Sequence, residues 1–210
     1  MYKIIFLFLF LTILFLFIIP TIWCYDPTLL VNLNYKKNLN ISEFEDKPCL
    51  FIANCNDFPY HHLDQIIVCR EAIDTKIKLN IISWYNEADI ITRTMKKFPL
   101  FAKYNLIYTK DNTIEKCKEK LKTEHVWMFL KEEWKTNGAY HILKDLNIPI
   151  IFVKITPIDK KEKEEKLIKN TFNRVYEIEY TKLENYDINK TPEDFTKFIK
   201  NKLYNSKLEN

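Results

Sequence analysis

Short apolar runs alternate with amphipathic segments along most of the chain. The runs are rich in β-branched and aromatic residues, which predicts strands. They lie at residues 49–53, 77–84, 106–108, 126–130, 148–155 and 174–180. Between them, apolar positions recur at helical spacing within residues 66–73, 87–97, 113–122 and 139–146. Strands that alternate with helices predict an α/β fold, in which a mostly parallel sheet is flanked by helices.

Two further segments complete the domain. The charge run KKEKEEKLIK at residues 160–169 has opposite signs at helical spacing, which indicates a solvated helix or an insert. After it, Thr191 and Pro192 have the residue types of a helix cap and a first turn. Apolar positions at helical spacing follow them. The pattern therefore predicts a closing helix that begins after Thr191.

The amino terminus carries the longest apolar stretch. Residues 4–19 are apolar apart from Thr12, and residues 20–23 extend the stretch towards about 20 residues, a length that spans a bilayer. The alternative is a cleaved signal peptide. The Ile-Trp-Cys sequence at residues 22–24 fits the small-residue cut site of such a peptide poorly. The pattern therefore favours an uncleaved transmembrane helix.

These segments predict three parts of the chain. Residues 1–24 are expected to form the transmembrane anchor and residues 25–46 a linker, in which Leu30, Val31 and Leu33 are predicted to form a short edge strand. Residues 47–205 are expected to form the α/β domain. The expected location is a membrane that the chain crosses once, with the endoplasmic reticulum as the candidate compartment.

Composition narrows the classes of function. The net charge of +4 is spread along the chain without a basic face or a nucleic-acid-binding motif, so we expect no nucleic-acid partner. The five cysteines are odd in number and include no Cys-x-x-Cys pair, which indicates neither a disulfide framework nor a zinc site. Buried reduced thiols and no bound metal are the expectation.

The first candidate site is a polar loop predicted at residues 54–64. It holds His61 and His62 together with Asp57 and Asp64. An imidazole beside a carboxylate can act as a general base whose tautomer the carboxylate holds. Two pairings are open, Asp57 with His62 and His61 with Asp64. A surface feature or a helix cap is the simpler alternative.

The second candidate site is a charged loop at residues 131–137, between two predicted buried strands. Gly138, the only glycine in the chain, follows it directly. Loops at the ends of buried strands often carry the ligand sites of α/β proteins. A solvated connection between core elements is the alternative.

The order of several segments resembles that of a known family. The segments are EDKPCLFIAN at 45–54, KFPLF at 97–101 with YTKDN at 108–112, VWMF at 126–129, and, at 138–153, a predicted helix followed by an apolar strand that begins after a proline. Over residues 45–203 this order resembles the glycerolipid acyltransferase family, whose members acylate lysophosphatidic acid and related acceptors. The resemblance implies acyl transfer from acyl-CoA to a hydroxyl of a lysophospholipid or glycerol phosphate. The implied partners are a membrane lipid and acyl-CoA, the latter as co-substrate, with no cofactor.

The resemblance also implies roles for the candidate residues. His62 or His61 would remove the hydroxyl proton, and Asp57 or Asp64 would hold the imidazole. The substrate-binding residues, at the phosphate of the acceptor, would be Lys110, Lys131, Glu132, Lys135 and Gly138. Of these, the lysines would neutralise the phosphate, and Gly138 would let the backbone come close to it.

The sequence diverges from the family at the catalytic motifs. Cys55 follows Asn54 where the family has a histidine, and residues 130–134 stand where it has Pro-Glu-Gly-Thr-Arg. Two alternatives are therefore open. One is a catalytically degenerate protein with the acyltransferase fold, and the other is an unrelated membrane-anchored α/β interaction domain. A hydrolase that uses Cys55 is a further alternative.

Overall fold

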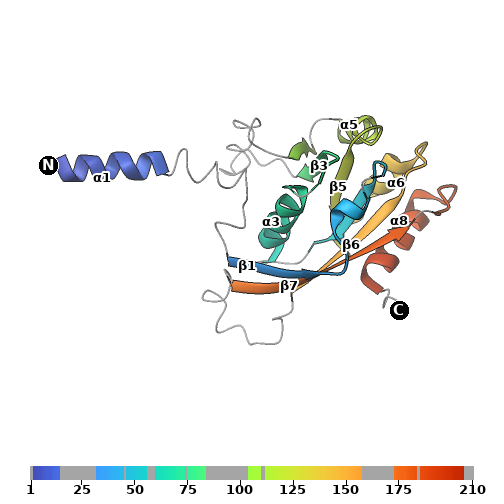
Figure 1. The fold of residues 1–210 in the computed structure, drawn as a ribbon. Helices are drawn as coiled ribbons and strands as arrows, with labels where there is room; N and C mark the ends of the chain where they lie inside the picture. The colour runs from blue at the N-terminus through green and yellow to red at the C-terminus, as the bar shows by residue number, and fades with distance from the viewer. Residues whose placement is uncertain are drawn as a thin grey trace.

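The computed structural model describes residues 2–14, 32–44, 46–55, 60–73, 75–83, 104–109, 112–157, 173–183 and 185–205. The described strands form one seven-stranded sheet (Figure 1). In chain order they are β1 (Asn32–Lys37), β2 (Leu50–Asn54), β3 (Leu79–Ser83), β4 (Tyr104–Tyr108), β5 (His125–Leu130), β6 (Ile150–Pro157) and β7 (Asn173–Leu183). Their order across the sheet is β1-β7-β6-β2-β5-β3-β4.

Most of the sheet is parallel. The strands from β6 through β2, β5 and β3 to β4 all run in one direction. Strand β7 is antiparallel to β6, and β1 is parallel to β7. The predicted α/β fold with a mostly parallel sheet is thus confirmed. Strand β1 lies within residues 25–46, the predicted linker, so the sheet includes residues that precede position 47.

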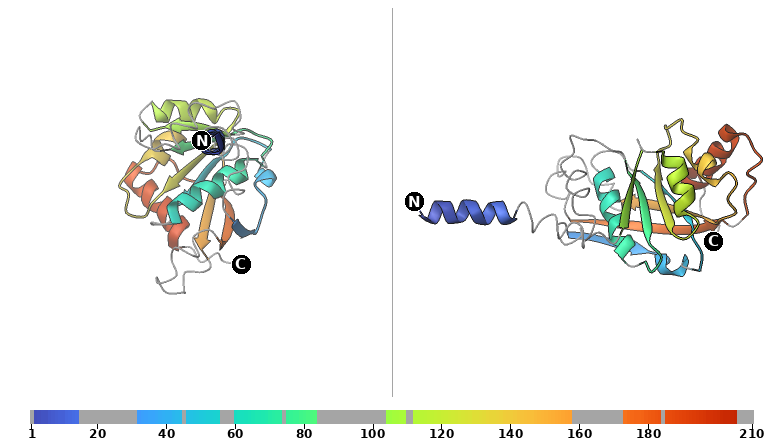
Figure 2. Two further views of the ribbon diagram at one scale, coloured as in Figure 1. Left: turned by 90° about the vertical axis from the view of Figure 1, so that its left-hand side faces the viewer. Right: turned by 90° about the horizontal axis from the view of Figure 1, so that it is seen from above.

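Helices cover both faces of the sheet (Figure 2). Helix α3 (Tyr60–Ile73) packs on one face. Helices α5 (Thr113–Lys120), α6 (Gly138–Leu143) and α8 (Pro192–Lys200) pack on the other. A 3-10 turn, η3 (Ile41–Phe44), follows β1, and a π-helical turn, η5 (Asn201–Asn205), extends α8. The sheet is therefore the middle layer of three.

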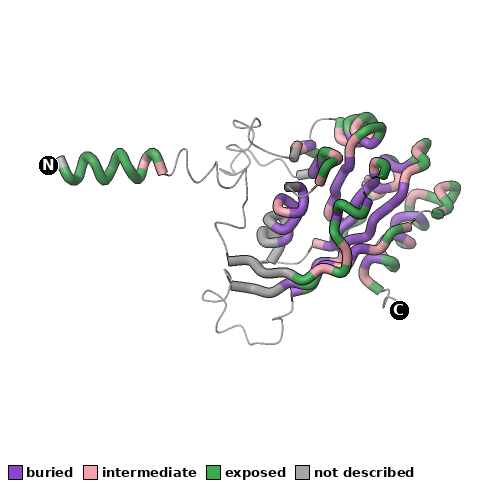
Figure 3. The backbone as a smooth tube through the Cα atoms, viewed as in Figure 1, coloured by how far each residue is buried: buried purple, intermediate pink, exposed green. Residues whose placement is uncertain are grey.

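The core follows from this layering. In β2, Phe51 and Ala53 pack with α3, whereas Leu50 and Ile52 pack with the helices on the other face. Every residue of β2 is buried, as the purple centre of the sheet in Figure 3 shows. A strand that is covered on both faces reads as a continuous apolar run in the sequence. This is why apolar runs located the central strands.

The amino-terminal helix α1 (Tyr2–Ile13) exposes its apolar side chains, among them Ile4, Phe6 and Phe8 (Figure 3). Across the described parts of the chain, no helix has both the length and the apolar character needed to cross a bilayer. The transmembrane helix predicted for residues 1–24 is therefore not found there, since α1 ends at Ile13 and residues 15–24 lie outside the described residues.

Two helix predictions changed or stayed open. Helix α3 begins at Tyr60, so His61 and His62 lie in its first turn and not in a loop. Hydrophobic spacing places this start too late because the first turn of a helix needs no apolar face. The helix predicted at 87–97 and the charge run at 160–169 lie outside the described residues. The closing helix begins as predicted, because Thr191 Oγ1 accepts a hydrogen bond from the backbone N of Asp194 at 3.1 Å.

Candidate active site

Both candidate segments start from the ends of neighbouring strands. Strands β2 and β5 are adjacent and parallel, and Asn54 is paired with Leu130 in their register. The chain leaves β2 for α3 on one face of the sheet and leaves β5 for α6 on the other. Ligands of open α/β sheets bind where such connections diverge at the carboxyl ends of strands. The structure therefore brings the first turn of α3 and the loop at 131–137 to the carboxyl ends of the parallel strands.

The side chain of Asn54 stabilises the carboxyl end of β2 by two hydrogen bonds to β6. Its Nδ2 donates a hydrogen bond to the carbonyl O of Ile155 at 3.0 Å, and its Oδ1 accepts one from the backbone N of Ile155 at 2.6 Å. The side chain is 8% exposed, so water has little access to replace these bonds. The amide therefore adds a side-chain contact between β2 and β6 beyond Ala53 and Val153, where the backbone register ends.

Replacement of Asn54 by alanine is expected to lower the free energy of unfolding by about 2 to 4 kcal/mol, because two buried backbone groups of Ile155 lose this partner. The midpoint of urea unfolding measures the change. Asn147→Ala, at an exposed asparagine, is the matched control and should shift stability by less than about 0.5 kcal/mol. Equal midpoints for the two variants would contradict the role of Asn54.

Helix α3 carries the candidate acid and bases. Asp64 is fully buried in this helix. His61 precedes it by three residues, a spacing at which helical positions are neighbours. The backbone therefore fits the pairing of His61 with Asp64. The side chains of His61 and His62, and all of Asp57 and Lys110, lie outside the described residues, so the pairing of Asp57 with His62 stays a prediction.

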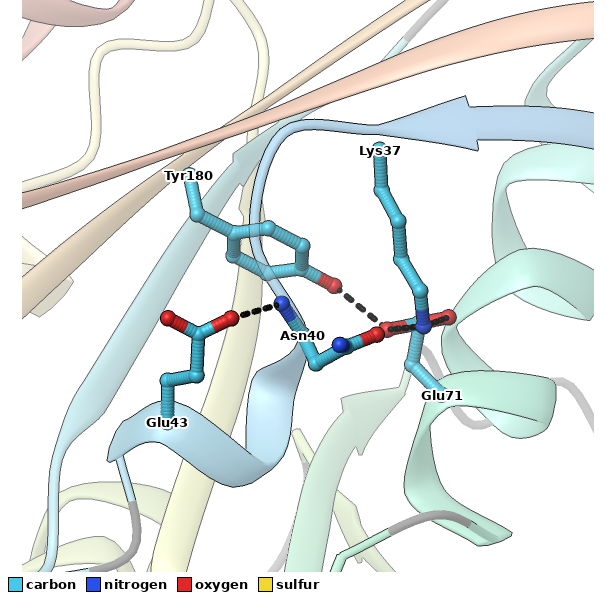
Figure 4. Close-up of polar contacts among 5 residues, drawn as sticks. All are labelled: Lys37, Asn40, Glu43, Glu71 and Tyr180. Carbon is cyan, nitrogen blue, oxygen red and sulfur yellow. Dashed lines mark hydrogen bonds and ion pairs between the residues drawn. The ribbon is translucent and has the colours of Figure 1, made fainter.

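A second buried acid, Glu71, ties α3 to strands β1 and β7 at one edge of the sheet (Figure 4). Lys37 Nζ of β1 donates to Glu71 Oε1 at 3.2 Å and to Oε2 at 3.3 Å, and the Tyr180 hydroxyl of β7 donates to Oε2 at 2.9 Å. The Glu71 side chain is fully buried, whereas that of Lys37 is 23% exposed. These contacts fix the helix that carries the candidate histidines against β1 and β7.

The loop at 131–137 is held by the end of the chain. Lys200 Nζ donates to the carbonyl oxygens of Glu132 and Trp134, the latter at 2.5 Å. The Tyr204 hydroxyl donates to the carbonyl O of Leu130, also at 2.5 Å. The loop conformation therefore depends on α8 and η5, although these elements are far from it in sequence.

Asn137, the last residue of this loop, joins it to α8. Its Nδ2 donates to Glu193 Oε1 at 3.1 Å, and its Oδ1 accepts from Thr196 Oγ1 at 2.9 Å. The asparagine precedes the first residue of α6, but its side chain does not cap that helix. It therefore serves the packing of the loop against α8.

Tyr204 also lies beside the end of β2. Burial raises the pKa of its hydroxyl well above the usual range, and a backbone hydrogen bond with Cys55 opposes this shift. The carboxylates of Glu132 and Glu133 raise it further. The tyrosine is therefore neutral at physiological pH. Its hydroxyl links the end of β2, at Cys55, to the end of β5, at Leu130, through hydrogen bonds.

Next to Tyr204 lies a groove of about 560 Å³ between the loop at 131–137 and the helices α8 and η5. Its walls include Glu132 and Lys135 from the loop. Lys131, in contrast, is not part of the lining and forms an ion pair with Glu133 at 3.7 Å. The structure thus places two of the predicted phosphate-site residues, Glu132 and Lys135, in one groove.

Gly138 is the first residue of α6, and its backbone does not need glycine. Its φ is not positive, and a Cβ built there would meet only Thr136 Oγ1 within 4 Å, at 3.5 Å, an ordinary contact. The sequence predicted this glycine as a place of close backbone approach. Within the described structure a Cβ would make only this ordinary contact, so only a bound substrate would make the residue type matter.

Gly138→Ala is therefore expected to raise the free energy of unfolding by about 0.4 to 1 kcal/mol, because alanine restricts the unfolded chain more than glycine does. Thermal unfolding measures this change. If a substrate phosphate approaches the backbone here, the same variant will lose acyl transfer while it gains stability. A loss of stability would contradict the conclusion that a Cβ fits beside Thr136 without strain.

The described cysteines are free thiols. Burial raises the pKa of Cys49 to about 11, against opposing effects of Lys182 and Lys47, and burial raises that of Cys117 to about 12. Both are therefore protonated and unreactive at neutral pH. Within the described ranges, no group of three or more His, Cys, Asp or Glu side chains converges in the way that metal ligands do.

Sequence reasoning missed several of these residues. Glu71 gave a usable signal, because a charged residue stands on the apolar face of α3 beside Ile67, Val68 and Ala72. No local pattern marks Tyr204, whose partner Leu130 is 74 positions away. Lys200 likewise reads as an ordinary polar surface position, and Asn137 was predicted only as part of the loop at 131–137.

No family model and no curated protein matches the sequence. A comparison of folds does find a likeness, and it is to an acyltransferase. One matching solved structure is that of the 1-acyl-sn-glycerophosphate (LPA) acyltransferase PlsC from Thermotoga maritima, with a TM-score of 0.52 and 10% sequence identity. The match covers 89% of this chain and 76% of that chain. At this identity the likeness shows the fold alone, so the chain shares its fold with that acyltransferase.

Proposed function

We propose that this protein transfers an acyl group from acyl-CoA to a hydroxyl of a lysophospholipid or glycerol phosphate at a membrane surface. One observation carries the proposal. The candidate helix start, which holds His61 and His62, and the charged loop at 131–137 follow the paired ends of β2 and β5, in a chain that shares its fold with an acyltransferase.

In the proposed reaction, His62 or His61 accepts the proton of the acceptor hydroxyl. The hydroxyl oxygen of the acceptor attacks the carbonyl carbon of the thioester. The carbon–sulfur bond breaks, and the thiolate of CoA leaves with the proton that the imidazole held. Asp64 is the preferred partner of His61, because it is buried one helical turn away. Asp57 is the corresponding partner of His62.

Lys131 and Lys110 are proposed to neutralise the acceptor's phosphate. Lys135 lines the groove beside the ends of β2 and β5, whereas Lys131 lies at the start of the loop. A lysine meets a phosphate as a point charge and lacks the two-pronged geometry of arginine. Lys110 belongs to this set by the resemblance alone.

Membrane association fits the same chemistry. The exposed apolar side chains of α1 suit contact with acyl chains, and a lysophospholipid acceptor resides in a bilayer. We therefore propose that residues 1–24 hold the domain at a membrane.

The release of CoA thiol tests the proposal. The purified chain in phospholipid vesicles is supplied with a long-chain acyl-CoA, with or without lysophosphatidic acid. The proposal predicts thiol release that depends on the acceptor. Release at the same rate without acceptor would indicate a thioesterase, and no release under either condition would indicate a catalytically degenerate relative.

A further inference from the structure

The groove between the loop at 131–137 and α8 carries an exposed aromatic side chain. Trp134 is 38% exposed, and outside α1 it is the one large apolar side chain of the described residues that is exposed. It lines the groove together with Asn137 and Asn201, whose amides offer both donors and acceptors. An indole at the wall of a polar groove offers a flat surface on which an aromatic ring can stack.

Three lysines line the same groove. Among the described residues, neither Lys135 nor Lys197 forms an ion pair or donates a side-chain hydrogen bond. Lys200 uses two of its three ammonium protons for loop carbonyls, which leaves one for a ligand. The facing acids are Glu193, which is bonded to Asn137, and Glu132. The cationic groups therefore outnumber the acids in a groove whose 560 Å³ suits a small molecule.

We propose that this groove binds the nucleotide end of acyl-CoA, the adenosine that carries a 3′-phosphate and a 5′-diphosphate. The adenine stacks on Trp134, and Lys135 and Lys197 contact the phosphates. This inference rests on the proposed function, and it makes Lys135 a residue of the donor site and not of the acceptor site. Base stacking on an aromatic side chain tolerates any purine and supplies much of the binding.

The position of the groove suits this assignment. The loop starts at Leu130, whose carbonyl is bonded to Tyr204 beside Cys55 at the end of β2. The groove lies on the face of the sheet that α6 and α8 cover, whereas the candidate histidines lie in α3 on the opposite face. A nucleotide held here leaves the flexible arm of CoA to cross the strand ends towards the first turn of α3.

Isothermal titration of the full chain with adenosine 3′,5′-bisphosphate tests the site without acyl transfer. We expect Trp134→Ala to weaken binding about tenfold or more and Trp134→Phe to restore part of it. Lys197→Met should weaken binding severalfold, and Lys122→Met, at an exposed lysine of the turn after α5, should not. The main-chain contact of Trp134 with Lys200 survives these substitutions, and circular dichroism checks the fold.

Two further arms separate the possible sources of phosphate. Glycerol 3-phosphate, the headgroup of the acceptor, should neither bind in the groove nor compete with the bisphosphate. Competition by glycerol 3-phosphate would overturn the proposal. The proposal would also fail if the Trp134→Ala variant bound the bisphosphate as tightly as the wild type does. The absence of bisphosphate binding would overturn it as well.

Kinetics distinguish a failure of the site from a failure of the function. In an active protein, Trp134→Ala should raise the KM for acyl-CoA and leave the KM for lysophosphatidic acid unchanged. Activity with an unchanged KM for acyl-CoA would overturn the site and leave the function standing. Bisphosphate binding without any acyl transfer would leave the site standing and remove the function.

Discussion

Replacement of Lys37 by methionine is expected to lower the free energy of unfolding by about 3 kcal/mol. The substitution removes a cation that contacts the fully buried carboxylate of Glu71, and breaking an ion pair of a buried charge is costly. The value lies at the low end for a buried ion pair because the Lys37 side chain is 23% exposed. The Tyr180 hydroxyl keeps its hydrogen bond to Glu71, so the helix stays partly anchored. Chemical unfolding measures the change.

The matched control is Lys36→Met, at the exposed neighbouring position of β1, which should shift stability by less than about 0.5 kcal/mol. A cycle with Glu71→Gln isolates the pair. The double variant should lose less stability than the sum of the two single losses, because the glutamine no longer carries a charge that needs a partner. Additive losses would show that Lys37 and Glu71 do not interact.

Loss of the general base should have the largest effect on activity. We expect one of the two variants His61→Ala and His62→Ala to lower kcat by about 10² to 10⁴-fold, since a positioned base contributes that much to a proton transfer. The other variant should remain near wild type. If His61 is the base, Asp64→Asn should lower kcat as well, because the amide no longer holds the imidazole in the required tautomer.

This experiment needs an internal control of folding. Gln65→Ala, at a neighbouring polar position of α3, should keep its activity, and circular dichroism should report the same helix content for every variant. A double His61→Ala/His62→Ala variant with wild-type activity would exclude both histidines as the base. A uniform loss in all variants, the control included, would indicate a damaged helix and contradict an assignment to either imidazole.

The sequence located the central strands well, for a physical reason. Strand β2 and the first four residues of β5 and of β6 are buried on both faces, so most of these residues form apolar runs. The edge strand β1 reads NLNYKK, in which polar residues dominate, and the sequence predicted it only as a short edge strand around residues 30–33 of the linker. An edge strand gains its place by pairing with a distant segment, here β7, and its own composition reveals little of that.

The candidate site was predicted only in part. The sequence identified the loop at 131–137 and the residues around His61 because polar groups there follow buried strands. It did not reveal that Tyr204 and Lys200 hold this loop, since hydrogen bonds over 66 to 74 positions leave no local pattern. Gly138 drew attention as the only glycine, yet the described backbone there suits any residue.

The formation of a new ester bond tests the account most directly. An acyl-CoA with a labelled acyl chain is incubated with lysophosphatidic acid and the purified chain in vesicles, and mass spectrometry follows the label. The account predicts labelled phosphatidic acid from the wild type and little from the His61→Ala/His62→Ala variant. Label that appears only as free fatty acid, or equal phosphatidic acid from both proteins, would contradict it.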